Sequence, residues 1–313
     1  MIEEIIGKSQ AIKKIRDRAK ELSGNRKNVL IVGPEGVGKG LVGKTIHEDS
    51  RYAKKPLIEL HLNVMDYDEV SDFLDGLEHG KVRRNNCEIV ATDGATLLLC
   101  DAADLSFTHQ KRFVTLISEY GDKRKGGARF IVTMREDADD LFEKRKLQED
   151  FYNVVKTFEY LSIPPLKERK EDVPYLVHHF AQQIAKRVGV GELVIDVNAL
   201  DILVRQSWNR NVKELKAVID RSVLLSDGRT FNLPPELLDE HGEIAKIMKH
   251  IAEGKELLVD HSLDFIQKRI IERVLERFEF NQKRTAEFLG ISEDTLRYRM
   301  RRLGIAIASE RSQ

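Results

Sequence analysis

The stretch VLIVGPEGVGKG, residues 29–40, joins a short apolar run to a glycine-rich loop and the start of a helix. Glycines let successive backbone N–H groups surround a polyphosphate, and a helix N-terminus adds a favourable dipole. The order strand, loop, helix gives weight to the G-x-x-x-x-G-K pattern and disfavours a plain glycine turn. We therefore predict that nucleotide phosphates are bound by Gly33, Pro34, Glu35, Gly36, Val37, Gly38, Lys39 and Gly40.

A second part of the predicted site lies at the end of another buried strand. The run Thr96–Cys100 is followed by Asp101, at the position where phosphate-loop ATPases hold their metal. Position 40 is Gly, so the usual hydroxyl ligand of Mg²⁺ is absent from the loop. We predict ATP or ADP as the cofactor, with Mg²⁺ held weakly by Asp101 through the nucleotide. The next residue, Ala102, can neither accept a proton nor hold a water molecule.

The bulk composition indicates a globular protein of two or three domains. The chain has 313 residues, 33% charged and 41% hydrophobic, with a formal net charge of zero. Its apolar runs are too short to span a bilayer, and residues 1–4 lack signal-peptide features, so we expect a cytoplasmic protein without membrane contact. Cys87 and Cys100 have no metal-ligand spacing, and histidines such as His178 and His179 have no matching partners. We expect none of them to bind metal.

The first half of the chain alternates between strand and helix patterns. Apolar runs without polar alternation are typical of strands buried on both faces of a parallel sheet. Amphipathic helices are predicted between most of these strands, as at 41–48 and 108–120. The fold class is therefore α/β, a parallel five-stranded sheet with helices on both faces. The five predicted strands are 29–32, 57–60, 96–100, 130–133 and 158–163.

The second half of the chain is predicted to be helical. Pro164 and Pro165 end the α/β region, because proline neither donates to a ladder nor continues a helix. Helices are then predicted at 172–188, 198–207 and 211–225. The predicted domains are an α/β nucleotide-binding domain (1–166), a helical lid (167–240), a linker (241–261) and a helical DNA-binding domain (262–313).

Residues 281–305, reading NQKRTAEFLGISEDTLRYRMRRLGI, have the pattern of a helix-turn-helix. Asn281 can cap a helix over 283–289, and Ser292 can cap a second one over 293–303. A preceding helix over 262–278 is the predicted dimer surface. The predicted core of the module is Ala286, Leu289, Ile291, Leu296 and Leu303.

The last of these helices carries four arginines with no acid among them. Arginine reads guanine edges bidentately or pairs with phosphates, so double-stranded DNA is the predicted partner. A solvated basic face is the alternative, which the turn and the caps disfavour. Glu293 and Asp294 oppose phosphate, so we expect DNA binding to need a homodimer. The predicted DNA contacts are Lys283, Arg284, Thr285, Ser292, Thr295, Arg297, Tyr298, Arg301 and Arg302.

Several motifs along the chain resemble those of the bacterial enhancer-binding proteins, the AAA+ activators of sigma-54 RNA polymerase. The module at 281–305 resembles the Fis-type helix-turn-helix of the same family. The resemblance implies an AAA+ α/β domain, a helical lid and a DNA-binding end, and we expect no receiver or sensory domain before them. The other matching motifs are IGKS (6–9), the loop at 33–39, DGATL (93–97), LSIPPLKERKEDV (161–173) and SWNRNVKEL (207–215).

The departures from the family pattern concern its catalytic residues. The family's GAFTGA loop, which touches the sigma factor, has no counterpart in the segment 80–93. Met134 stands for the sensor asparagine, and Gln148 and Val154 stand for the two arginine fingers. Lys213 replaces the sensor arginine of the lid; we expect it near the nucleotide, although lysine lacks the bidentate grip of arginine. Together these replacements indicate a pseudo-ATPase.

Three readings of the function follow from the sequence. The first is a DNA-binding transcription regulator whose AAA+ domain binds nucleotide without hydrolysing it. The second is a divergent ATP-hydrolysing sigma-54 activator. The third is an adaptor whose AAA+ body binds a protein partner and whose DNA contacts are secondary. Higher AAA+ oligomers and contacts with related activators or RNA polymerase are compatible with each reading.

Overall fold

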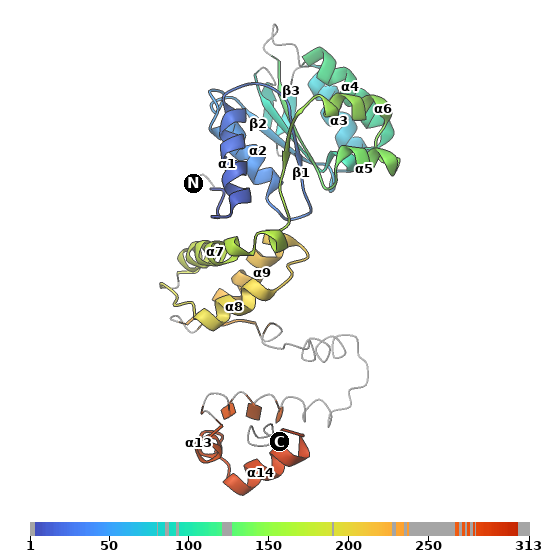
Figure 1. The fold of residues 1–313 in the computed structure, drawn as a ribbon. Coiled ribbons are helices and arrows are strands. Elements are labelled where there is room, and N and C mark those ends of the chain that lie inside the picture. Colours follow the sequence, from blue (N-terminus) through green and yellow to red (C-terminus); the bar gives the residue numbers. More distant parts are fainter. Residues whose placement is uncertain are drawn as a thin grey trace. The chain divides into compact units, whose positions relative to one another are not determined.

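The chain forms two compact units, residues 1–234 and 235–313, which are treated separately below (Figure 1). The structure is a computed structural model. It describes residues 4–79, 81–84, 88–91, 94–120, 127–189, 191–226, 230–234, 237, 267–268, 271–272, 274–275, 278 and 280–305. No helix in these described ranges is long and apolar enough to cross a membrane.

Five parallel strands form the central sheet of the first unit, in the order β2-β5-β6-β1-β7. This confirms the predicted fold class and each of the five predicted strands to within a residue at either end. Burial from both sides explains why the apolar residues of β1 and β5 run on without alternation, whereas β2 and β7, at the two edges of the sheet, are only partly buried. The strands are β1 (Val29–Val32), β2 (Leu57–His61), β5 (Thr96–Cys100), β6 (Arg129–Met134) and β7 (Glu159–Ser162).

Helices cover both faces of this sheet, and successive strand residues belong to two different apolar clusters. Leu97 and Leu99 pack on one side, whereas Leu98 between them packs on the other, as the period of two in a strand requires. The cluster containing Leu98 includes α1 (Gln10–Ser23) and α2 (Lys39–Glu48). The opposite cluster includes α3 (Tyr67–Glu78), α4 (Phe107–Tyr120), α5 (Ala138–Glu143) and α6 (Glu149–Lys156).

Two further strands lie in a segment for which no strand was predicted. Strands β3 (Lys81–Arg84) and β4 (Glu88–Ala91) form an antiparallel pair that is separate from the central sheet. Both fall inside the segment 80–93, which takes the place of the family's GAFTGA loop in the sequence comparison.

The remainder of the first unit is helical, as predicted after Pro164 and Pro165. Helices α7 and α9 pack against each other, and α7 also contacts α8. Trp208 is buried beside them, where its indole N–H donates a 2.8 Å hydrogen bond to the carbonyl of Leu203. The elements are η3 (Leu166–Glu168), η4 (Lys170–Asp172), α7 (Val173–Val188), α8 (Val197–Arg205) and α9 (Asn211–Leu224).

The described part of the second unit contains the predicted helix-turn-helix, formed by α13 (Gln282–Phe288) and α14 (Glu293–Arg302). Both predicted caps are confirmed, because Asn281 and Ser292 accept hydrogen bonds from the backbone N–H three residues later. Of the predicted helix 262–278, residues 267–268, 271–272 and 274–275 are described and are helical. The predicted linker 241–261 lies outside the described residues. The core unites Ala286, Leu289, Ile291, Leu296 and Leu303, as predicted, with Ile271, Leu275, Met300 and Ile305.

Candidate functional site

The glycine loop lies at the carboxyl end of β1, against the neighbouring strand β6 and the lid. The N–H of Gly33 donates a 3.1 Å hydrogen bond to the carbonyl of Met134. Gly36 has a φ of +78°, and a Cβ added there would lie 2.1 Å from the carbonyl oxygen of Arg210. Only glycine fits this position, because the lid backbone approaches the loop so closely.

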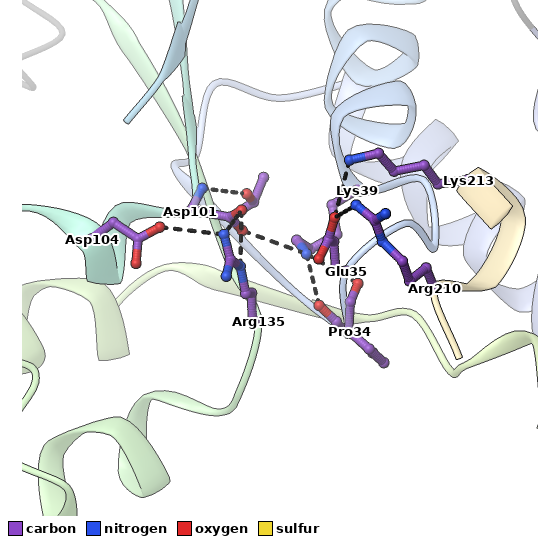
Figure 2. Close-up of polar contacts among 10 residues, drawn as sticks. Pro34, Glu35, Lys39, Asp101, Asp104, Arg135, Arg210 and Lys213 are labelled. Atoms are coloured by element: carbon purple, nitrogen blue, oxygen red, sulfur yellow. Dashed lines mark hydrogen bonds and ion pairs between the residues drawn. The ribbon is translucent and has the colours of Figure 1, made fainter. Parts of the chain in front are cut away.

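Lys39 opens α2 and folds back over the loop (Figure 2). Its ammonium donates to the carbonyls of Gly33 at 2.8 Å and Pro34 at 3.2 Å. The carboxylate of Asp101 is 3.6 Å away. Burial lowers the pKa of Lys39, and the negative charge of Asp101 opposes that shift. The structure thus brings together the lysine and the acid that the sequence predicted to share one site.

Asp101 directly follows β5 and is bound by two residues at the end of β6, Thr133 and Arg135. Its backbone N–H donates to the hydroxyl of Thr133 at 3.0 Å. Its Oδ2 receives the guanidinium of Arg135, with the η nitrogen at 3.0 Å, and the same arginine reaches Asp104 at 3.4 Å (Figure 2). The sequence analysis did not include Arg135 among the site residues. Arg135 could have been predicted from its position, because it directly follows a buried strand at the edge of the sheet where the loop lies.

The other oxygen of Asp101 tests whether a divalent cation fits here. Oδ1 is buried and has no hydrogen bond within the described part of the chain. This oxygen lies 3.6 Å from the ammonium of Lys39 but accepts no hydrogen bond from the described residues, so it can still bind a hard cation, which takes oxygen ligands. The position after Lys39 is Gly40, which supplies no hydroxyl. The residues present therefore fit Mg²⁺ held by a single protein carboxylate together with nucleotide phosphates.

Glu35, at the tip of the loop, is bound by the lid (Figure 2). Its Oε1 lies 3.0 Å from the ammonium of Lys213 and 3.1 Å from the guanidinium of Arg210. These two donors lower the pKa of Glu35 to about 2. The buried amide of Asn211 adds a 2.7 Å hydrogen bond to the carbonyl of Glu35. Lys213 thus lies beside the loop, as expected, whereas Arg210 and Asn211 were not predicted because only the folded chain brings them to it.

Two positions to which the resemblance assigns a role in hydrolysis hold buried apolar side chains. Ala102 begins a short 3-10 helix, η1 (Ala102–Asp104), and is fully buried. Met134 ends β6 and is equally buried, in the apolar cluster beneath α5 and α6. Neither side chain offers a polar atom that can orient water toward a phosphate.

The two positions that the resemblance assigns to arginine fingers lie at α6. Gln148 is the residue before the helix, and its backbone N–H donates a 2.8 Å hydrogen bond to the side chain of Gln110. Val154, in the last turn, packs against the apolar core. Neither side chain is positively charged, so neither can bind a nucleotide phosphate as an arginine does.

Cys100, directly before Asp101, is a free cysteine. Burial, followed by the negative charges of Glu59 and Asp101, raises the pKa of its thiol to about 12. The thiol is therefore neutral at physiological pH. Cys87 lies outside the described residues.

In the second unit, most of the predicted DNA contacts lie at the surface of α13 and α14. Tyr298 is 65% exposed, and Met300 is buried in the core, as predicted for a residue that turns inward. The hydroxyl of Ser292 is occupied in capping α14 and is shared with Thr295. The exposed predicted contacts are Lys283, Arg284, Ser292, Arg297, Tyr298, Arg301 and Arg302.

Two of the predicted contacts need revision. Thr285 is fully buried, and its hydroxyl has no hydrogen bond within the described residues, so the prediction that it contacts DNA is wrong for this structure. Its side chain lies on the inner side of α13, where its neighbour Ala286 is also buried. Arg297 is exposed, but it binds Gln282 at 3.0 Å and Glu293 at 3.3 Å. Its guanidinium is partly engaged within the module.

Three family models match the sequence in consecutive order. Residues 5–160 match the Sigma-54 interaction domain, and residues 167–247 match the AAA+ ATPase lid domain. Residues 262–303 match the bacterial regulatory protein, Fis family.

Similar proteins carry the same arrangement within longer chains. Regulatory protein AtoC of Escherichia coli (strain K12) is 29% identical over 316 residues, which cover 96% of this chain and 68% of AtoC. The phenol regulator MopR of Acinetobacter guillouiae is 25% identical over 95% of this chain, which spans only 56% of MopR. A crystal structure of NtrX from Brucella abortus in complex with ATP aligns with a TM-score of 0.66 and 24% identity, covering 97% of this chain and 70% of that one. The chain belongs to the bacterial enhancer-binding protein family, the AAA+ activators of sigma-54 RNA polymerase with a Fis-type helix-turn-helix.

Proposed function

We propose that this protein is a DNA-binding transcription regulator whose AAA+ domain binds ATP or ADP without hydrolysing it. The proposal rests on two neighbouring positions at the end of β5, of which one keeps a phosphate-site acid and the other has lost a polar side chain. Lys39 and Asp101 are held 3.6 Å apart at the loop, whereas the next position, Ala102, is a fully buried alanine. Binding groups are thus retained where the group that activates water is missing. The ATP complex of NtrX supports nucleotide binding by a protein of this fold.

The size of the expected defect supports the second half of this proposal. An arginine finger alone contributes roughly 10³–10⁵ in rate in comparable phosphoryl-transfer systems. A general base contributes roughly 10²–10⁴. Gln148, Val154 and Ala102 can supply neither effect. In this proposal Mg²⁺, when bound, neutralises phosphate charge beside Asp101, while Lys39 and Lys213 bind the phosphates from the loop and the lid.

Steady-state phosphate release from the purified full chain, with ATP and Mg²⁺ in excess, tests the proposal. We expect a rate no higher than that of the Lys39→Ala variant, which serves as the background. Nucleotide binding, measured separately by calorimetry, is expected to persist in the unchanged protein. A turnover of about one per second, at the low end for enzymes, would overturn the pseudo-ATPase assignment.

A hydrolysing sigma-54 activator is the second candidate, favoured by the cations that surround the loop. Arg135 and Lys213 both lie close enough to take part in phosphate binding. Activation by contact with the sigma factor would then have to proceed without a GAFTGA segment in residues 80–93. Transcription in vitro with sigma-54 polymerase distinguishes the two candidates. ATP-dependent open-complex formation would establish the activator, and its absence would favour a regulator that acts by another route.

The DNA-binding end is proposed to act as a homodimer in the cytoplasm. Each module is small, and the acids Glu293 and Asp294 at the start of α14 weaken its attraction for phosphate. Two modules on half-sites roughly one helical turn apart supply the missing affinity. Higher AAA+ oligomers and contacts with related activators or RNA polymerase fit the same proposal. An adaptor with secondary DNA contacts would bind DNA weakly, and with few phosphate contacts its salt slope would be small.

A further inference from the structure

Three metal-binding side chains that are scattered in the sequence meet on one face of the central sheet. Glu59 and His61 lie two residues apart on β2, so their side chains point to the same side. Cys100 is the register partner of His61 on the neighbouring parallel strand β5. One ligand atom from each residue lies within 4.8 Å of the other two. The three donors are therefore close together because their strands are paired in this register, and not because flexible surface side chains happen to meet.

The surroundings of Glu59 orient its carboxylate for this role. The ammonium of Lys44, on α2, lies 2.9 Å from Oε2. The other oxygen, Oε1, lies 3.5 Å from Nε2 of His61. A carboxylate held at one oxygen by a neighbouring donor, with the other oxygen turned toward further ligands, is typical of metal sites.

Gly40 lies beside one oxygen of Glu59 and has no side chain to cover it. A Cβ at Gly40 would lie 3.6 Å from Oε1 of Glu59, at ordinary van der Waals contact. His61 is 57% exposed and Glu59 is 24% exposed, so solvent and ions reach the cluster from outside. Gly40, which lacks the hydroxyl usual at this position of the phosphate loop, thus leaves the approach to Glu59 open.

We propose that Glu59, His61 and Cys100 form a binding site for Zn²⁺. Sulfur, imidazole nitrogen and carboxylate oxygen together are the ligands that Zn²⁺ accepts, whereas Mg²⁺ and Ca²⁺ take oxygen almost alone. On binding, the thiol of Cys100 passes its proton to solvent and the sulfur coordinates as thiolate. Three protein ligands leave a fourth tetrahedral position for water. The site lies beside the phosphate loop but uses none of its residues, so it does not depend on nucleotide binding.

Sequence spacing conceals this site, which explains why the sequence analysis assigned no metal to Cys100. Linear metal motifs place ligands a few residues apart, but here 39 positions separate His61 from its register partner Cys100. The competing explanation is a simple ion pair between Glu59 and His61 with a neighbouring thiol. Such a pair does not involve the sulfur of Cys100. The two explanations therefore differ in whether replacing Cys100 changes the binding of Zn²⁺.

The test uses the full chain without a histidine tag, with Zn²⁺ alone as the probe in competition with a chromophoric chelator. We expect about one equivalent to bind tightly. Cys100→Ser and His61→Ala should each weaken binding by more than about tenfold, and Glu59→Gln should do so too. Cys87→Ser and His178→Ala are the matched controls and should bind as the unchanged chain does.

Co²⁺ provides a second measurement, which reports the ligands through their absorption spectrum. A thiolate ligand produces a charge-transfer band in the near ultraviolet, and tetrahedral Co²⁺ gives intense visible bands. We expect both in the unchanged chain and neither in Cys100→Ser, with the circular dichroism spectrum of the variant showing that it is folded. The proposal is overturned if no Zn²⁺ binds, if the Co²⁺ spectrum lacks the thiolate band, or if the control variants lose binding as the ligand variants do.

Discussion

The hydroxyl of Ser9 donates a 2.6 Å hydrogen bond to Oδ2 of Asp172, across 163 residues of sequence. The other oxygen of Asp172 accepts the backbone N–H groups of Lys8 and Ser9, both at 2.7 Å. A Cβ at Gly7 would lie 2.6 Å from this carboxylate, so glycine is required there. The family-like motifs at 6–9 and 161–173 therefore form one joint between the N-terminus and the lid.

This joint predicts that Asp172→Ala strongly destabilises the first unit. Asp172 is fully buried, and Arg169, 3.8 Å away, is nearly so. Removing the acid leaves three donors and a buried cation without their acceptor, which costs about 3–5 kcal/mol. Unfolding of the full chain in urea, followed by circular dichroism, measures the loss. Asp196→Ala, which removes an exposed cap from α8, is the control and should cost about 1 kcal/mol. Equal losses in the two variants would contradict a special role for Asp172.

The elements that the sequence predicts well are those whose signal is local. Strands β1 and β5 are continuous apolar runs, and the caps Asn281 and Ser292 immediately precede the helices that they begin. The contacts of Lys39 with its own loop follow from the same short segment.

The contacts that the sequence misses join distant segments. Glu35 meets Arg210 over 175 positions, and no periodicity or spacing records that approach. The burial of Thr285 depends on how the module packs, which a polar residue in a basic segment does not reveal. The β3–β4 pair is missed for a different reason, because β3 reads KVRR and is polar, and the apolar run of β4, IVA, is only three residues long.

The contact of Glu35 with the lid predicts a pH-dependent contribution to stability. The folded pKa, about 2, lies below the ordinary value of 4.5, so the stabilisation is complete above about pH 4.5 and is lost as the pH falls toward 2. The side chains of Glu35 and Lys213 are 43% and 61% exposed, so screening limits the pair to about 0–1 kcal/mol.

Glu35→Gln should accordingly lower the free energy of unfolding by at most about 1 kcal/mol at pH 7. The difference from the unchanged chain should shrink at lower pH and at high salt. Urea titrations at several pH values measure it, and a double-mutant cycle with Lys213→Gln isolates the pair. A difference that stays constant down to pH 3 would show that the charge of Glu35 is not its cause.

Lys39→Ala should abolish measurable binding of ATP and ADP. The ammonium of Lys39 is the only cation of the described residues that the loop itself supplies, and its present acceptors are carbonyls that phosphate oxygens can replace. Calorimetry with each nucleotide measures the loss. Lys20→Ala, on the exposed last turn of α1, removes the same charge away from the loop and should leave the affinity unchanged. Unchanged affinity in Lys39→Ala would disprove the assignment of the phosphate loop.

The DNA-binding helix gives the last prediction. Positions 297 and 301 share one face of α14, and positions 298 and 302 share the neighbouring face. Met300 and Leu303 pack inward, which leaves this double stripe outward. Arg297 is partly neutralised by Glu293, whereas Arg301 is exposed in the last turn. We therefore expect Arg301 to contribute more to DNA binding than Arg297.

Arg301→Ala in the full chain should weaken binding by about 1–3 kcal/mol if the guanidinium reads a base edge, and only on duplexes that contain that base. If it contacts phosphate alone, the loss should be similar on every duplex and the salt slope should fall by about one unit. Gel-shift titrations across salt concentrations, on duplexes selected by the protein from a random library, separate these outcomes. Arg187→Ala removes an exposed arginine from the lid and controls for net charge. If Arg301→Ala and Arg187→Ala bind equally well, the stripe on α14 is not the DNA-contacting surface, because the two variants differ only in where the same positive charge was lost.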